Sequence, residues 1–91
     1  MGLKGGKVMY RILDEVKAVL KQRALEDYGP GKAVLERVQM LWSEYFDFIF
    51  STKDVAMMMA LFKIARESFK PKRDNLIDAI GYLVLASELE D

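Results

Sequence analysis

Apolar side chains recur along this 91-residue chain at steps of three and four, the spacing that gathers them on one face of an α-helix. A first helix is predicted over about 7–25, where apolar residues stand four apart: Val8, Ile12, Val16 and Leu20. A second is predicted over about 32–48, with one apolar stripe: Val34, Val38, Leu41, Trp42, Tyr45 and Phe46. Gly29-Pro30-Gly31 separates the two, because glycine and proline both interrupt a helix.

Two more helices are predicted over about 52–69 and 73–89, on either side of Pro71. Ser51 and Asp54 are spaced as a capping box at the start of the third helix. That helix is apolar on nearly every side through its first half, so it is either buried all round or buried on one side and used as an interface on the other. No strand-like alternation is present. The pattern predicts an all-α single domain, a bundle of four helices covering residues 1–91.

Composition narrows the class of protein. Apolar residues make up 52% and charged residues 31%, which is typical of a soluble globular domain, and 91 residues hold only one core. Lys and Arg balance Asp and Glu at fourteen each, which argues against general nucleic-acid binding. A helix-turn-helix is the weakest alternative, since the one basic cluster is Lys70, Lys72 and Arg73. The longest apolar run, 55–62, is far shorter than the roughly 20 residues that cross a bilayer. We therefore expect a cytoplasmic protein without a membrane span.

The chain contains no cysteine and no histidine. This excludes disulfides, thiolate zinc sites, imidazole ligands and Ser-His-Asp catalysis. Any chemistry must come from carboxylates, Lys, Arg and Tyr, and these groups suit hard cations and phosphates.

Two aspartates stand out in the fourth helix. Asp74 and Asp78 are four residues apart on one face, where like charges repel by a few tenths of a kcal/mol unless a cation lies between them. A divalent metal is one such cation. The structural alternative makes Asp74 the N-cap of this helix and Asp78 a surface residue near its positive end.

Basic and aromatic residues are candidates for binding the phosphates and the base of a nucleotide. Lys63 and Arg66 lie on one face of the third helix, either in an internal salt-bridge network with Asp74 and Asp78 or as cations that meet phosphate oxygens. Tyr28 and Trp42 either stack on a base or belong to the core. If Asp78 is a metal ligand, Asp78→Asn is expected to be neutral or stabilising without metal; if it pairs with a buried cation, the same change destabilises.

Four ordered motifs resemble a family of small phage and prophage proteins without settled function: Asp27-Tyr28-Gly29, Leu41-Trp42-Ser43, Asp54-Val55-Ala56 leading to Lys63-Ile64-Ala65-Arg66, and Asp74 and Asp78 followed by Gly81-Tyr82. That family is similar to the MazG-like all-α nucleoside triphosphate pyrophosphohydrolases, whose magnesium-binding acidic helix the last motif resembles. The resemblance implies a helical fold, oligomeric assembly, Mg²⁺ and a nucleotide ligand. The third helix departs from the MazG pattern, since it has no glutamate before Glu67.

On this basis we expect a nucleotide-binding, phage-type protein. If it is an enzyme, we expect a Mg-dependent nucleoside triphosphate pyrophosphohydrolase with a degenerate metal motif. Asp74, Asp78 and Asp54 would hold Mg²⁺, Lys63 and Arg66 would meet the phosphates, and Tyr28, Trp42 and Tyr82 would contact base or sugar. The alternative is a non-catalytic helical module that sequesters a nucleotide or assembles with a protein partner. We also expect a homo-oligomer, because four short helices cannot bury this much apolar surface alone.

Overall fold

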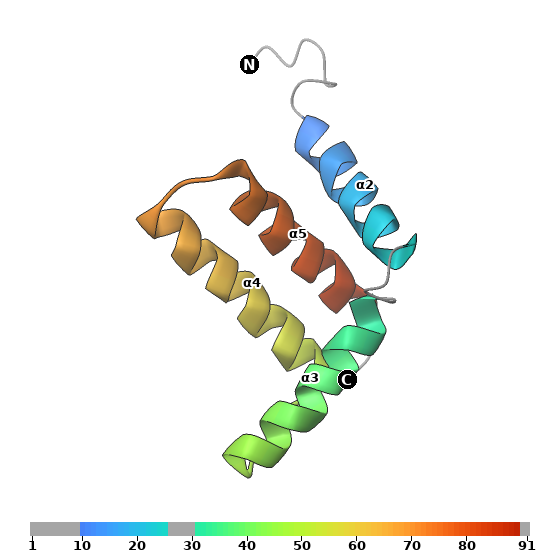
Figure 1. The fold of residues 1–91 in the computed structure, drawn as a ribbon, viewed down its shortest axis with the longest axis vertical. Coiled ribbons are helices and arrows are strands. Elements are labelled where there is room, and N and C mark those ends of the chain that lie inside the picture. Colours follow the sequence, from blue (N-terminus) through green and yellow to red (C-terminus); the bar gives the residue numbers. More distant parts are fainter. Residues whose placement is uncertain (1–9, 26–30, 90–91) are drawn as a thin grey trace.

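The computed structural model describes residues 10–25 and 31–89. Within these ranges the chain forms four helices and no strand: α2 (Arg11–Leu25), α3 (Gly31–Phe46), α4 (Thr52–Phe69) and α5 (Arg73–Ser87) (Figure 1). The prediction of an all-α domain with four helices is confirmed.

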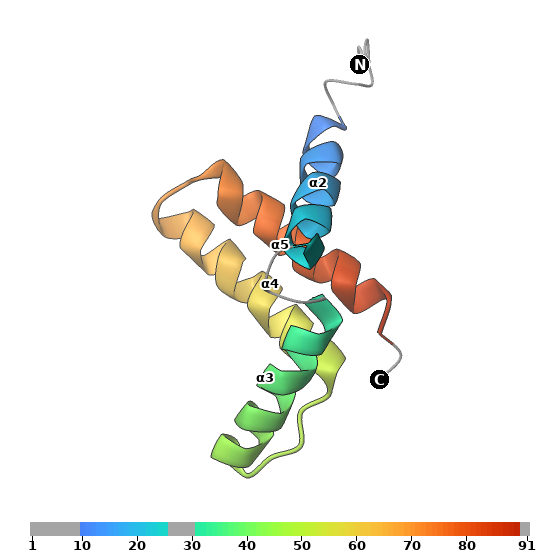
Figure 2. The ribbon, with the colours of Figure 1, turned by 45° about the vertical axis from the view of Figure 1, so that its right-hand side comes forward.

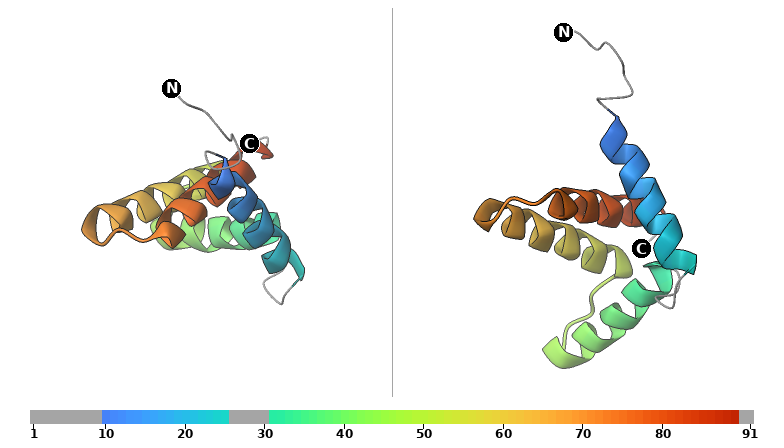
Figure 3. Two further views of the ribbon diagram at one scale, coloured as in Figure 1. Left: turned by 90° about the horizontal axis from the view of Figure 1, so that it is seen from above. Right: turned by 45° about the horizontal axis from the view of Figure 1, so that its top comes forward.

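The helices α4 and α5 form an antiparallel hairpin around which the rest is arranged (Figure 1). The helix α2 packs against α5, on the side away from α4, and runs in the same general direction as α5. The helix α3 begins where the ends of α2 and α5 meet and packs against α4, but its C-terminal half projects away from the hairpin (Figures 2 and 3). The ends of α2 and α5 and the start of α3 therefore come together at one junction of the described helices.

Local signals set the ends of α4. Ser51 is its N-cap: the Ser51 hydroxyl accepts a hydrogen bond from the Asp54 amide at 2.9 Å, and the Asp54 carboxylate accepts one from the Ser51 amide at 3.2 Å. This confirms the capping box. At the other end Lys70 has extended backbone, as expected for a residue before proline, and α4 ends at Phe69.

The other helix ends differ slightly from the sequence expectation. The helix α3 ends at Phe46 rather than 48, because Asp47 adopts a left-handed conformation (φ 53°) and the Phe48 amide turns back to the Ser43 carbonyl at 3.2 Å. The helix α5 ends at Ser87 rather than 89. Tyr10 lies in a turn before α2, and residues 7–9 lie outside the described ranges. Asp74 is not the N-cap of α5, since Lys72 holds that position without a side-chain cap.

The main core lies where α3, α4 and the end of α5 meet. Five residues are buried there: Leu35, Val55, Ala56, Ala86 and Leu89. Trp42 is half-buried against this cluster and meets the Phe50 ring edge-on at 6.5 Å between ring centres. Trp42 therefore has the core role that the sequence left open. In the part of the chain that is described, no helix is both long and apolar enough to span a membrane.

Candidate functional site

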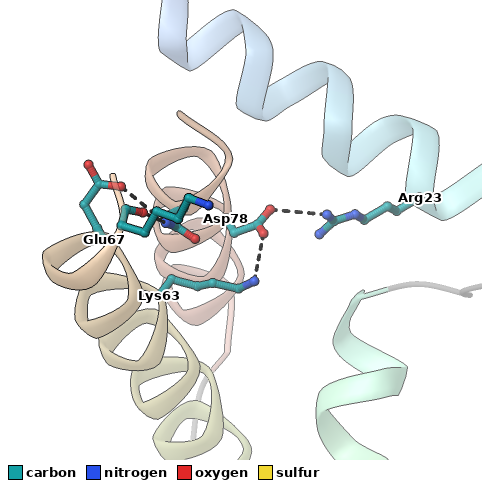
Figure 4. A network of polar contacts seen from close by, with 6 residues as sticks. Arg23, Lys63, Glu67 and Asp78 are labelled. Atoms are coloured by element: carbon teal, nitrogen blue, oxygen red, sulfur yellow. Dashed lines mark hydrogen bonds and ion pairs between the residues drawn. The ribbon is translucent and has the colours of Figure 1, made fainter. Parts of the chain in front are cut away.

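Asp78 of α5 lies between two basic side chains, one from α4 and one from α2 (Figure 4). The Lys63 ammonium of α4 lies 3.0 Å from Asp78 Oδ2, and the Arg23 guanidinium of α2 lies 3.2 Å from Asp78 Oδ1. The Asp78 and Lys63 side chains are 14% and 20% exposed, whereas Arg23 is 49% exposed. The network links α2 and α4 to α5, and it confirms the salt-bridge interpretation for Lys63 and Asp78.

A second polar cluster fixes the turn between α4 and α5 (Figure 4). The Glu67 carboxylate accepts hydrogen bonds from the Lys72 amide at 2.9 Å and from the Asn75 side chain at 3.3 Å. Asn75 is buried, and its amide also donates to the Lys70 carbonyl at 3.3 Å. These bonds satisfy buried polar groups and hold the hairpin closed, which is a structural role.

An exposed ion pair ties the first half of α2 to the start of α5. Arg73 Nε donates to the Glu15 carboxylate oxygens at 3.0 and 2.9 Å, and Arg73 makes a further ion pair with Glu15 through its guanidinium. The hydrogen bond from Arg73 lowers the pKa of Glu15 below its usual value, and the same bond raises the pKa of Arg73. Arg73 is thus occupied by Glu15 and does not add to a basic cluster.

Beside the Asp78 network lies a cavity of about 300 Å³ to which all four helices contribute. Its walls are mostly apolar: Leu20, Gly31, Val34, Leu35, Val38, Met59 and Leu85. Arg23 and Tyr82 supply its polar side-chain groups. A much smaller cavity of about 20 Å³ between α2 and α5 shares Arg23 and Tyr82 and is also lined by Asp78. The charged network therefore borders the space in which a small molecule would fit.

The three aspartates predicted as magnesium ligands do not come together. Asp54 is exposed at the start of α4 and Asp74 is exposed at the start of α5. Because the two helices are antiparallel, these residues lie at opposite ends of the hairpin, roughly 25 Å apart along an 18-residue helix. Asp78 already binds two cationic side chains. Residues 10–25 and 31–89 contain no group of three acidic residues placed to hold a metal, so this arrangement does not fit Mg²⁺.

The predicted nucleotide contacts are likewise separated. Tyr82 lines the cavity and Lys63 lies in the adjoining network, but Arg66 is exposed, with its guanidinium 5.9 Å from the centre of the Phe62 ring. Trp42 belongs to the core, and Tyr28 lies outside the described residues. Arg23 was not singled out from the sequence. It lies 55 residues from Asp78, and no local pattern connects two such distant positions.

Comparison with known proteins places the chain in a family. Its residues 11–90 match the family described as "Domain of unknown function (DUF6378)", and the chain belongs to that family. The chain is also 32% identical over 81 residues to the Gene 55 protein of Mycobacterium phage L5. That match covers 87% of this chain and 52% of the relative, so the chain spans about half of the relative's length. No solved structure matched. The expected kinship with phage proteins of unknown function is confirmed.

Proposed function

We propose that this member of the phage-related family binds a nucleotide in the cavity where its four helices meet. The observation that carries the proposal is a cavity of about 300 Å³ with apolar walls and a guanidinium at its edge. A base has two apolar π-faces and fits between aliphatic side chains and the Tyr82 ring. A phosphate needs a cation, and Arg23 supplies one that makes paired hydrogen bonds to oxyanions.

Arg23 is able to serve a ligand without leaving a buried charge unpaired. Its side chain is 49% exposed, and Asp78 keeps Lys63 as a partner at 3.0 Å when Arg23 turns away. When a phosphate binds, Arg23 would therefore give up its contact with Asp78 and form hydrogen bonds to the phosphate oxygens instead. The cost is small, because exposed ion pairs contribute only about 0–1 kcal/mol.

Hydrolysis has weaker support than binding. A MazG-like pyrophosphohydrolase would use Mg²⁺ on clustered carboxylates, and in this chain Asp54, Asp74 and Asp78 are spread over the hairpin. The resemblance of the Asp74 and Asp78 motif to that class rests on the sequence alone, and it suggests a nucleotide as the type of ligand. We therefore propose a nucleotide-binding protein whose described residues do not by themselves form a magnesium centre.

The proposal is tested by thermal unfolding with a panel of ribo- and deoxyribonucleoside triphosphates, with and without Mg²⁺. A ligand that binds only the folded chain stabilises it and so raises Tm. At a ligand concentration of a hundred times Kd, the free energy of unfolding increases by about 2.7 kcal/mol. Sodium pyrophosphate should compete for the cation. Absence of any shift across the panel would overturn the proposal.

Two variants locate the site. Arg23→Gln should remove most of the nucleotide-dependent shift, measured against the variant's own unliganded Tm, whereas Arg37→Gln, an exposed change on α3, should leave it intact. Val34→Trp fills the cavity from a half-exposed wall position and should also abolish the shift. Equal shifts in wild type, Arg23→Gln and Val34→Trp would place the nucleotide elsewhere.

The second candidate, a module that assembles with a protein partner, is favoured by a different observation. The outward side of α4 is apolar and exposed over most of its length. It lies on the opposite side of α4 from the core.

A further inference from the structure

The end of α3 and the loop after it carry large apolar side chains that face water. Tyr45 and Ile49 are 84% and 86% exposed, and Phe46 and Phe48 are exposed as well. We call these four residues the apolar tip; they belong to the part of the chain that projects away from the hairpin (Figure 2). Single exposed apolar residues are normal on a protein surface, but four on one projection indicate a contact surface.

The apolar tip is held in a fixed conformation. The Phe48 amide donates to the Ser43 carbonyl at 3.2 Å, and the Phe50 amide donates to the Ser43 hydroxyl at 3.0 Å. The Gln39 side chain donates to the Phe50 carbonyl at 2.8 Å. The rings of Phe46 and Phe48 both contact the Phe50 ring, which packs against the core. A preorganised surface loses little conformational freedom on binding, so this tip is suited to insertion into a partner.

A groove lies at the other end of α4, beside the turn that leads to α5. Its volume is about 380 Å³. Three apolar residues line it: Phe62, Ala65 and Phe69. Three cationic residues line it as well: Arg66, Lys70 and Lys72. We call it the basic groove, since no acidic residue is among the described residues that line it. Its ligand should therefore combine apolar groups with negative charge.

The basic groove stays positive when its neighbours are counted. Two further cations of this region, Lys63 and Arg73, are already paired with carboxylates of other helices. Two carboxylates of the same turn, Glu67 and Asp74, stand against the three cations of the groove. The Glu67 carboxylate accepts two hydrogen bonds from the turn itself. A positive balance of one charge remains, and the cations are the groups that line the groove.

The apolar tip has the opposite charge. Glu44 and Asp47 lie among its residues and are exposed. No basic residue occurs in the sequence between Arg37 and Lys53, and Lys53 is followed directly by Asp54, so the two carboxylates of the tip are not balanced by a neighbour in the sequence. The tip and the groove therefore match in three respects: a projection and a hollow, apolar groups on both, and opposite charge.

We propose that the apolar tip of one copy of this chain binds in the basic groove of a second copy. A chain cannot fill its own groove, because the 18-residue helix α4 separates the end of α3 from the turn before α5 (Figures 1 and 2). Each copy offers one tip and one groove, so the copies associate head to tail, in a ring or an open chain. No residue of either surface lines the cavity where the four helices meet, so the assembly is independent of nucleotide binding.

Two complementary variants test the head-to-tail contact. Wild type should have at least twice the 10.5 kDa chain mass in gel filtration with light scattering. Ile49→Lys spoils the tip and Phe69→Glu spoils the groove; both positions are more than four-fifths exposed, so the helical circular dichroism should be unchanged. Each variant alone should be a monomer. Their mixture should form a dimer of one copy of each, because one intact tip and one intact groove remain.

The matched controls are Leu13→Lys on α2 and Leu83→Glu on α5, which change exposed apolar residues outside both surfaces and should assemble as wild type does. A monomeric wild type would overturn the proposal and leave the groove to another anionic partner. A mixture no heavier than the separate variants, or either variant assembling alone as wild type does, would overturn it too.

Cross-linking tests the same contact without disrupting it. Because the chain lacks cysteine, Ile49→Cys and Phe69→Cys each introduce one thiol. In the head-to-tail contact, residue 49 of one copy lies near residue 69 of the next. Mild oxidation of the mixed variants should therefore give mainly the mixed disulfide, and Leu83→Cys should not cross-link to either. Efficient self-linking of each variant, with little mixed product, would show a symmetric pair and contradict the proposal.

Discussion

At the scale of single residues, Asp78 determines how the charges inside this molecule are interpreted. A carboxylate that is 14% exposed and flanked by an ammonium and a guanidinium is a structural counter-ion. Removing it would leave Lys63, itself 20% exposed, without a carboxylate partner. The sign expected for Asp78→Asn therefore reverses from the metal-ligand expectation: the substitution should destabilise.

We predict that Asp78→Asn lowers the free energy of unfolding by about 1–3 kcal/mol, because the amide cannot balance two cations. The loss stays below that of a fully buried pair, since Arg23 retains water. The measurement is urea unfolding followed by circular dichroism. Asp74→Asn is the control; this exposed residue should change stability by no more than about 0.5 kcal/mol. An unchanged or stabilised Asp78→Asn would support the metal interpretation instead.

The sequence predicted two of the three residues of this network, Lys63 and Asp78. A salt bridge between Lys63 and Asp78 was one of the two interpretations offered, because charges inside apolar helices need partners. Arg23 was missed, since it lies in a helix with many other charges and its contact with Asp78 depends on how α2 crosses α5. Arg66 was predicted to accompany Lys63, because residues three apart on a helix point in similar directions. In the structure Lys63 faces α5 and pairs with Asp78, whereas Arg66 lies over the Phe62 ring.

At the scale of elements, boundaries with a local chemical cause were predicted best. Ser51, Asp54 and Pro71 define both ends of α4 through hydrogen bonds and sterics within a few residues. The end of α3 was not predicted, because Asp47 takes a positive φ that many other residues avoid and that sequence alone does not require.

The contact between α2 and α5 leaves room at Gly81. This glycine is buried inside α5, and a Cβ there would lie 3.6 Å from Leu20 Cδ2, an ordinary van der Waals distance. Alanine has a higher helix propensity than glycine by about 0.8–1.0 kcal/mol. We predict that Gly81→Ala stabilises the protein by about 0.5–1 kcal/mol, measured as a rise in the urea midpoint. A lower midpoint would mean that α2 cannot accept the methyl group.

At the scale of the whole molecule, the core is small because many large apolar side chains in the described part of the chain remain exposed. The third helix was predicted to be buried all round or to carry an interface, and the structure shows the inward half of that pattern directly. The cavity was not predictable, since its lining comes from four helices whose relative positions no local pattern fixes. The same holds for the projecting end of α3 and the loop after it, where Tyr45 and Ile49 are more than four-fifths exposed.

The attachment of α2 has a consequence for the order in which the structure opens. Two ion pairs join α2 to α5, Glu15 with Arg73 and Arg23 with Asp78, and the arginine of each pair is about half exposed. The ion pair between α4 and α5, Lys63 with Asp78, is much less exposed. Added salt screens exposed ion pairs but leaves apolar packing intact. The helix α2 is therefore the element that detaches first as ionic strength rises, and amide hydrogen exchange in α2 should be the most sensitive to salt. Since Leu20 and Arg23 line the cavity, detachment of α2 would also expose the cavity to solvent.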